Sequence, residues 1–152
     1  MSHAVSPQVF AQVKEVFDCW NERDFDGMLD MWADDGVFDV SAVFVDVPPT
    51  RGHADLSRCW HQLLQSLDGL RMDPVEVFSL GSRRYAVDMR LWGKGRQSGV
   101  EVDHRYGYVC AFGEDGKCLN ARLLPDLASA LAIGQEDASD ERNARAVTGL
   151  DS

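Results

Sequence analysis

The sequence is short of basic residues and has no long apolar run. Its 152 residues hold 15 Lys and Arg against 25 Asp and Glu, a formal net charge of −10 at pH 7. Such an acidic chain disfavours general binding to nucleic acid or to anionic membranes, which requires Lys and Arg patches. No apolar segment approaches the roughly 18 residues that cross a bilayer, and the first residues lack the pattern of a secretory signal. We therefore predict a cytoplasmic protein that binds neither nucleic acid nor membrane.

Cysteine is also sparse, and its spacing does not predict a metal site. Cys19, Cys59, Cys110 and Cys118 form no C-x-x-C pair, and no His lies at zinc-finger spacing from them. Buried free thiols are therefore expected. The sequence also lacks a phosphate-binding glycine loop, a nucleotide fingerprint and a Ser-His-Asp order. These observations predict a chain that works without a cofactor or metal.

The remaining pattern is that of one domain with helices first and strands after. Ser6-Pro7 is a typical helix start, because Ser caps the first turn and Pro fits its first position. Apolar stripes predict helices over 7–20, 24–32 and 53–67. Alternating or β-rich segments predict strands over 37–40, 42–47, 75–80, 84–92, 98–112 and 117–124. A short helix over 126–133 is also expected. This order indicates an α+β fold with the helices on one face of a curved antiparallel sheet.

Three segments are expected along the chain. Residues 1–7 are predicted to be a flexible start, and residues 8–133 the folded domain. From Gly134 the apolar pattern fades, and the segment 134–152 holds five acidic and two basic residues. This composition predicts an acidic, flexible C-terminal tail.

Local sequence motifs add a family resemblance to this order of elements. The motifs that carry it are Trp20–Asp26, Trp32–Phe38, Arg51–His53, Gly93–Gly95, Ser98–Val100 and Asp115–Lys117. In this order they resemble the SnoaL-like group of the nuclear transport factor two-like superfamily, which includes polyketide cyclases and ketosteroid isomerases. The resemblance implies a cone-shaped curved sheet wrapped by three N-terminal helices, a cystatin-like α+β roll with an apolar pocket. It also implies a homodimer.

The resemblance points first to Asp39 as a catalytic residue. Asp39 falls where ketosteroid isomerases keep their catalytic aspartate, and a carboxylate facing an apolar pocket is a plausible general base. The alternative is a strand-end Asp that faces solvent or binds a nearby backbone amide. Tyr108 falls where those isomerases place the second acid of the oxyanion hole, and a phenol can donate the same hydrogen bond.

Strand alternation selects the neighbours of Tyr108. Period two places His104, Tyr106 and Tyr108 on the face toward the helices, and Asp103 on the other face. His104 is therefore predicted to be catalytic and Tyr106 to bind substrate. The alternative for each of these residues is ordinary packing with one satisfied polar atom.

Aromatic residues on the predicted helices are expected to shape the pocket. Trp20, Trp32 and Trp60 lie at positions that line the pocket in the resembled family, and Val16 replaces that family's helix tyrosine. All four are predicted to bind substrate, with ordinary core packing as the alternative.

Departures from the family pattern leave the activity open. Val16 cannot donate the hydrogen bond of the family's tyrosine. Asp88 and Arg90 lie two apart on one strand face, but they do not match the Asp-Arg-Asp order of limonene-type epoxide hydrolases and are interpreted as an ion pair. The leading hypothesis is a cofactor-free acid–base enzyme, an isomerase, cyclase or dehydratase, on a small hydrophobic molecule. The alternatives are a non-catalytic binder of such a molecule and a protein-interaction module.

Overall fold

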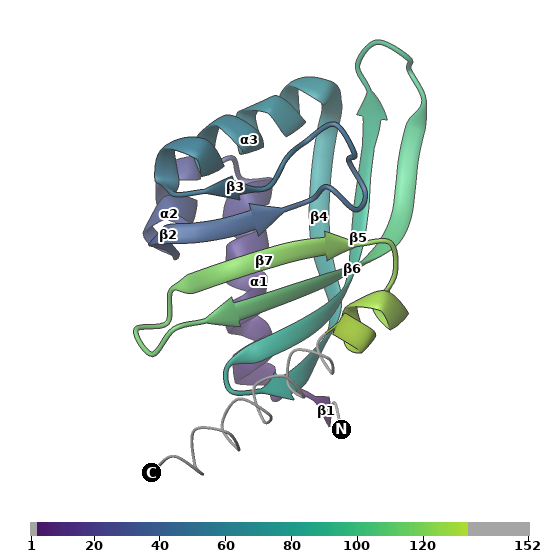
Figure 1. Ribbon diagram of the computed structural model, residues 1–152. Helices are drawn as coiled ribbons and strands as arrows, with labels where there is room; N and C mark the ends of the chain where they lie inside the picture. The colour runs from purple at the N-terminus through teal and green to yellow at the C-terminus, as the bar shows by residue number, and fades with distance from the viewer. Residues whose placement is uncertain (1–2, 134–152) are drawn as a thin grey trace, which may run out of the picture.

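The protein is described from a computed structural model, which describes residues 3–133 of the chain (Figure 1). The elements follow in the order β1 (His3–Ala4), α1 (Pro7–Asn21), α2 (Phe25–Asp30), β2 (Trp32–Asp39), β3 (Thr50–Arg51), α3 (His53–Ser66), β4 (Leu67–Gly81), β5 (Arg84–Gly95), β6 (Glu101–Phe112), β7 (Cys118–Leu124) and a last helix over residues 127–133. The predicted tail over 134–152 lies outside the described residues. Among residues 3–133, no helix combines the length and apolar character that crossing a bilayer requires.

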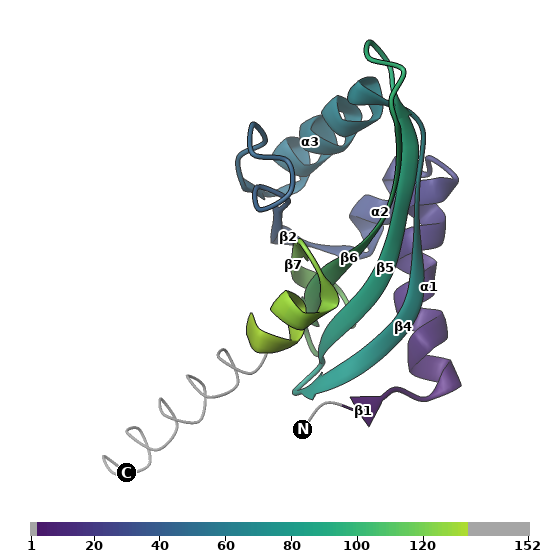
Figure 2. The same cartoon turned by 90° about the vertical axis from the view of Figure 1, so that its right-hand side faces the viewer.

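One curved sheet carries all the described strands. Its strand order is β1-β4-β5-β6-β7-β2-β3, and Figure 2 shows the long strands β4, β5 and β6 bending together. Neighbouring strands run antiparallel except β2 and β7, which pair in parallel with Phe38 opposite Ala121. The predicted α+β fold with a curved sheet is confirmed, with this one parallel pair as a correction to the all-antiparallel expectation.

The first helix forms as its sequence predicts and is joined to β4 at its end. The Ser6 side chain accepts a hydrogen bond from the Val9 backbone N–H, and Pro7 occupies the first helical position. At the last residue of the helix, the Asn21 amide donates to the Met72 carbonyl at 2.7 Å and accepts from the Met72 N–H at 2.9 Å. Arg23 donates to the Leu70 carbonyl at 2.6 Å. The polar break between α1 and α2 therefore fixes these helices against the sheet.

The segment 42–47 is not a strand, contrary to the prediction. It forms turns in which the N–H groups of Val43 and Phe44 donate to the Val40 carbonyl. Val43 and Phe44 pack part of their surface against the core, so these β-prone side chains are buried without strand pairing. Strands β2 and β4 begin earlier than predicted, at Trp32 and Leu67, so that Gly36 lies within β2 and Gly69, with a φ of 63°, lies within β4.

The helix over 127–133 covers part of the outer sheet face. Asp126 caps it, since its side chain accepts from the Ser129 N–H at 2.7 Å. Ala130 then packs with Ala86, Val109 and Leu124 in a small apolar cluster. The predicted helix at this position is confirmed.

The N-terminal segment is described only from His3 onward. His3 pairs with Ser79 and Ala4 with Phe78, so β1 adds an edge strand to β4. The flexibility expected for residues 1–7 stays a prediction.

Candidate functional site

Nine side chains from the helices and the sheet line a small space within the fold, the inner cavity. Its lining residues are Val16, Phe17, Trp20, Met28, Trp32, Phe38, Trp60, Met72 and Tyr108. Its free volume is about 30 Å³, room for about two water molecules. Any larger ligand must displace side chains, and the unbranched Met28 and Met72 are the most adaptable of the lining residues.

Three tryptophans from three different elements form much of this lining. Trp20 comes from α1, Trp32 from β2 and Trp60 from α3, and their exposed fractions are 3%, 1% and 0%. The Trp32 and Trp60 rings meet edge to face at 5.9 Å between centroids. Among the described residues, none provides an acceptor for the indole Nε1–H of any of the three. A buried donor without an acceptor costs about 1–3 kcal/mol, so three such donors around one cavity require an explanation.

Tyr108 adds the only hydroxyl on this lining. It is 7% exposed, and its ring packs edge to face on Phe17 at 5.2 Å between centroids. Burial raises the pKa of the Tyr108 phenol well above its usual value, and the nearby Cys118 and Cys110 thiols act in the same direction. The phenol therefore stays protonated at neutral pH and can donate a hydrogen bond.

Asp39 does not reach the inner cavity, contrary to the expectation of a pocket-facing base. Phe38 lines the cavity, and neighbouring residues on a strand point to opposite faces, so Asp39 points away. Its carboxylate accepts hydrogen bonds from the Ser41 N–H at 2.9 Å and the Ser41 hydroxyl at 2.6 Å. The other oxygen lies 3.9 Å from the Arg122 Nε on β7. The structure thus matches the alternative of a strand-end carboxylate that binds a local backbone amide.

His104 and Tyr106 also lie away from the inner cavity. His104 is exposed, and its ring contacts that of Tyr106 at 4.6 Å between centroids. Tyr106 is partly buried, and burial raises the pKa of its phenol. Both residues share the face of Tyr108, as alternation predicts, but they lie toward the projecting end of the β5–β6 hairpin (Figure 1).

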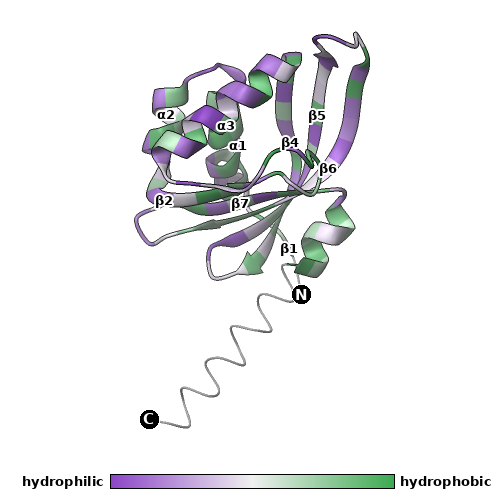
Figure 3. Cartoon of the chain, turned by 45° about the horizontal axis from the view of Figure 1, so that its top comes forward, coloured by the Kyte–Doolittle hydropathy of each residue, from purple (hydrophilic) through white to green (hydrophobic). Residues whose placement is uncertain are grey.

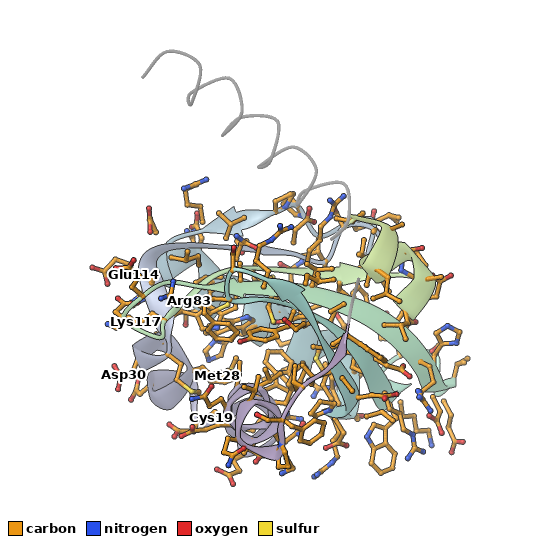
Figure 4. The ribbon with its side chains drawn as sticks, turned by 90° about the horizontal axis from the view of Figure 1, so that it is seen from below. Cys19, Met28, Asp30, Arg83, Glu114 and Lys117 are labelled. Atoms are coloured by element: carbon orange, nitrogen blue, oxygen red, sulfur yellow. The ribbon has the colours of Figure 1, made fainter. Side chains whose placement is uncertain are left out.

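A larger outer cleft opens between α1 and the turns that follow β4 and β6. Its free volume is about 460 Å³, within the range of small-molecule sites. Its lining residues are Gln12, Val13, Glu15, Val16, Met31, Arg83, Tyr85, Phe112, Gly113, Glu114 and Gly116. Figure 4 views the molecule from below and labels Arg83 and Glu114 of the two turns.

A closed neck lies between the outer cleft and the inner cavity. Its lining residues are Val13, Val16, Phe17, Tyr108, Cys110, Phe112 and Cys118, and it leaves no free volume. Val16 lines the cleft, the neck and the cavity alike. Movement at Val16 and Phe112 would therefore join the two spaces.

The predicted site residues lie on the inner cavity more than on the outer cleft. Val16, Trp20, Trp32, Trp60 and Tyr108 were predicted site residues, and all five line the inner cavity. The turn residues Arg83 and Glu114 were not predicted; the turn signals beside them were the only indication that they lie at an end of the sheet. Within residues 3–133, no three His, Cys, Asp or Glu side chains gather as a metal site would require.

The solved structures that resemble this chain share its fold at low sequence identity. One is a protein of ketosteroid isomerase-like fold from Catenulispora acidiphila, in complex with trimethylamine. It is 11% identical with a TM-score of 0.68, over 84% of this chain and 92% of that one. Another is RV0760c from Mycobacterium tuberculosis in complex with estradiol-17beta-hemisuccinate, at 19% identity and a TM-score of 0.64, over 74% and 89% of the two chains.

A third similar structure is an enzyme. It is the epoxide hydrolase/cyclase-like SalBIII of pyran ring formation in the polyether salinomycin, at 18% identity and a TM-score of 0.63, over 75% of this chain and 87% of that one. A search of curated proteins finds no match. The family model of the SnoaL-like domain matches residues 13–121, from the first helix to the last strand. By this match over most of its length, the chain belongs to the SnoaL-like domain family.

Proposed function

We propose that this chain binds a small hydrophobic molecule, which enters by the outer cleft and reaches the inner cavity past Val16. The observation that carries the proposal is the lining of the inner cavity, where nine aliphatic and aromatic side chains include no carboxylate, imidazole or cation. Such a lining favours an apolar ligand with few polar groups. The steroid conjugate bound by the similar M. tuberculosis protein supports this class of ligand.

An acid–base enzyme on the same kind of molecule is the alternative. Isomerase or cyclase chemistry requires a base next to the substrate. Asp39 faces away from the cavity, and Tyr108, with its raised pKa, is a poor base at neutral pH. The geometry therefore favours binding without proton abstraction by Asp39.

A bulky side chain at Val16, which lines the outer cleft, the neck and the inner cavity, tests the proposed entry route of the ligand. Val16→Trp would fill the junction of cleft, neck and cavity, whereas Val100→Trp adds the same ring at a position that is 62% exposed, beyond the opposite end of β5 and β6. A ligand at a hundred times its Kd stabilises the native chain by about 2.7 kcal/mol. In a chain of this size, each kcal/mol of stabilisation raises Tm by roughly 2–4 °C.

A thermal-shift screen with phenols, steroids and polyketide-like aromatics gives the measurement. We expect shifts in the native chain and in Val100→Trp, and none in Val16→Trp. Equal shifts in both variants would place the ligand elsewhere, and no shift in the native chain would favour a protein-interaction module.

Asp39→Asn separates binding from catalysis. The amide oxygen can still accept from Ser41, so the fold should persist. The proposal expects unchanged ligand affinity, because Asp39 lies outside the cavity. Turnover of a bound ligand that disappears in Asp39→Asn would instead establish the acid–base enzyme.

The homodimer expected from the family and the cytoplasmic location stay predictions. Size-exclusion chromatography at several concentrations tests the first, and a strictly monomeric profile would contradict it.

A further inference from the structure

The three cavity tryptophans differ from the fourth tryptophan of the chain in how their N–H groups are used. Trp92 is 36% exposed on β5, and its indole N–H lies 3.4 Å from an Asp73 carboxylate oxygen. The N–H groups of Trp20, Trp32 and Trp60 are buried and have no acceptor among residues 3–133. Among residues 3–133, the buried side-chain donors without an acceptor therefore all belong to residues that line one cavity, and the exposed Trp92 does not share this property.

The other polar atoms on the lining do not balance these donors. The Tyr108 hydroxyl brings one donor as well as one acceptor oxygen, so it cannot pair three indole N–H groups, and the thioether sulfurs of Met28 and Met72 are only weak acceptors. Buried donors are normally paired, so the lining is short of lone pairs. A complementary ligand is one that brings an acceptor atom.

The charge of this acceptor also follows from the lining. The described residues place no cation on the inner cavity, so a carboxylate there would be a buried anion without a counter-ion. A neutral acceptor such as a carbonyl or ether oxygen avoids that cost. The apolar part of the same molecule would pack on the aromatic rings and toward the neck.

Resting on the proposed function, we infer that the ligand of the inner cavity carries a neutral acceptor oxygen, and that the indole N–H groups of Trp20, Trp32 and Trp60 bind it. The residues select for a ketone, quinone or ether over a hydrocarbon of the same shape. A site that holds acceptors of this kind rejects the analogue without them, because its buried donors are then left unpaired.

The test uses two probes of equal shape, acetophenone and α-methylstyrene, in which a C=CH₂ group replaces the C=O group. The full chain is labelled with ¹⁵N, and its four indole N–H signals are assigned with single Trp→Phe variants. We expect acetophenone to bind at least about tenfold more tightly, equal to about 1.4 kcal/mol. It should shift at least one cavity indole signal downfield and leave that of Trp92 in place.

Variants sharpen the test. Trp60→Phe keeps an aromatic ring and removes one donor, so it should reduce the preference for acetophenone, whereas Trp92→Phe should leave the preference unchanged. Because the probe pair is compared on the native chain, a variant that fails to fold does not remove the test.

The outcomes distinguish failure of the acceptor inference from failure of the proposed binding function. Equal affinity for the two probes would overturn the acceptor inference and leave the proposed binding of hydrophobic molecules intact. Binding of neither probe, with none in the wider screen, would overturn both. Preferential binding of tetramethylammonium, a cation that stacks on ring faces, would also overturn the inference.

Discussion

The two faces of strands β5 and β6 are built from alternate residues of the same segments, yet the polar groups gathered on the two sides of these strands are in opposite states. On the outer face, Arg90 binds Asp103 through two hydrogen bonds of 2.8 and 2.7 Å, and Arg105 pairs with Asp88 in the same two-pronged manner. Figure 3 shows the hydrophilic and hydrophobic residues alternating along these strands.

On the inner face the situation is reversed. Val87, Met89 and Leu91 are fully buried, and Tyr108 beside them lines a cavity whose indole donors have no acceptor among the described residues. The outer face satisfies its charges within the chain, whereas the cavity beneath the inner face is lined by indole donors of α1, β2 and α3 that have no acceptor among the described residues. This difference indicates that the molecule's unused binding capacity lies inside, and the following changes test it.

The largest loss of unfolding free energy is expected when a buried tryptophan of the interior is truncated. Trp60→Ala should lower the free energy of unfolding by about 3–5 kcal/mol, because a fully buried aromatic ring leaves a cavity behind. Trp92→Ala is the matched control, with an expected loss of about 1 kcal/mol or less, since that ring is partly exposed under Arg90. Urea unfolding measures both. Equal losses would contradict the contrast between the two faces.

An intermediate loss of unfolding free energy is expected where the helix over 127–133 covers the outer face of the sheet. Gly107→Ala would place a methyl group against the Asp126 carbonyl and the Ala130 side chain, so the helix over 127–133 must shift. We expect a loss of about 1–3 kcal/mol in urea unfolding. In the control Gly95→Ala, the nearest group is the Ser98 hydroxyl, which can rotate away at the loss of one exposed hydrogen bond from the Val100 N–H. A loss in the control as large as that in Gly107→Ala would show that close packing by this helix is not the cause.

The smallest effect is expected for the exposed ion pairs, and it depends on pH. Hydrogen bonding from Arg90 holds the pKa of Asp103 below its usual value. A carboxyl with a lowered pKa adds stability above its unfolded pKa, and this stability is lost as the pH falls through the folded pKa. Arg90→Gln should therefore lower Tm slightly at pH 7, and the difference from the native chain should shrink in strong acid, where only the contact of Arg90 with the Trp92 ring remains, and at high salt. A constant difference down to pH 2 would contradict this origin.

The sequence predicted the elements better than the contacts between them. Period-two alternation placed Tyr108 inside and Asp103 outside, and both placements are confirmed. The same alternation predicted an ion pair between Asp88 and Arg90 on one strand. The structure pairs each of them with a residue of β6 instead, because the register of neighbouring strands brings those partners closer.

In the candidate site, too, some residues were predicted correctly and others were not. The aromatic lining was predicted from the family resemblance and is found at the cavity, whereas the pocket-facing direction of Asp39, predicted from the same resemblance, is wrong because Asp39 alternates with the cavity-lining Phe38 on β2. The missing acceptors could not be predicted, because the partner of a buried N–H is set by the packing of α1, β2 and α3 together.

A crystal structure of the chain with acetophenone would test the central claim most directly. We expect the probe in the inner cavity, with its carbonyl oxygen at about 3 Å from the Nε1 of Trp20, Trp32 or Trp60. A probe found only in the outer cleft, or one in the inner cavity whose carbonyl contacts none of the three indoles, would contradict it.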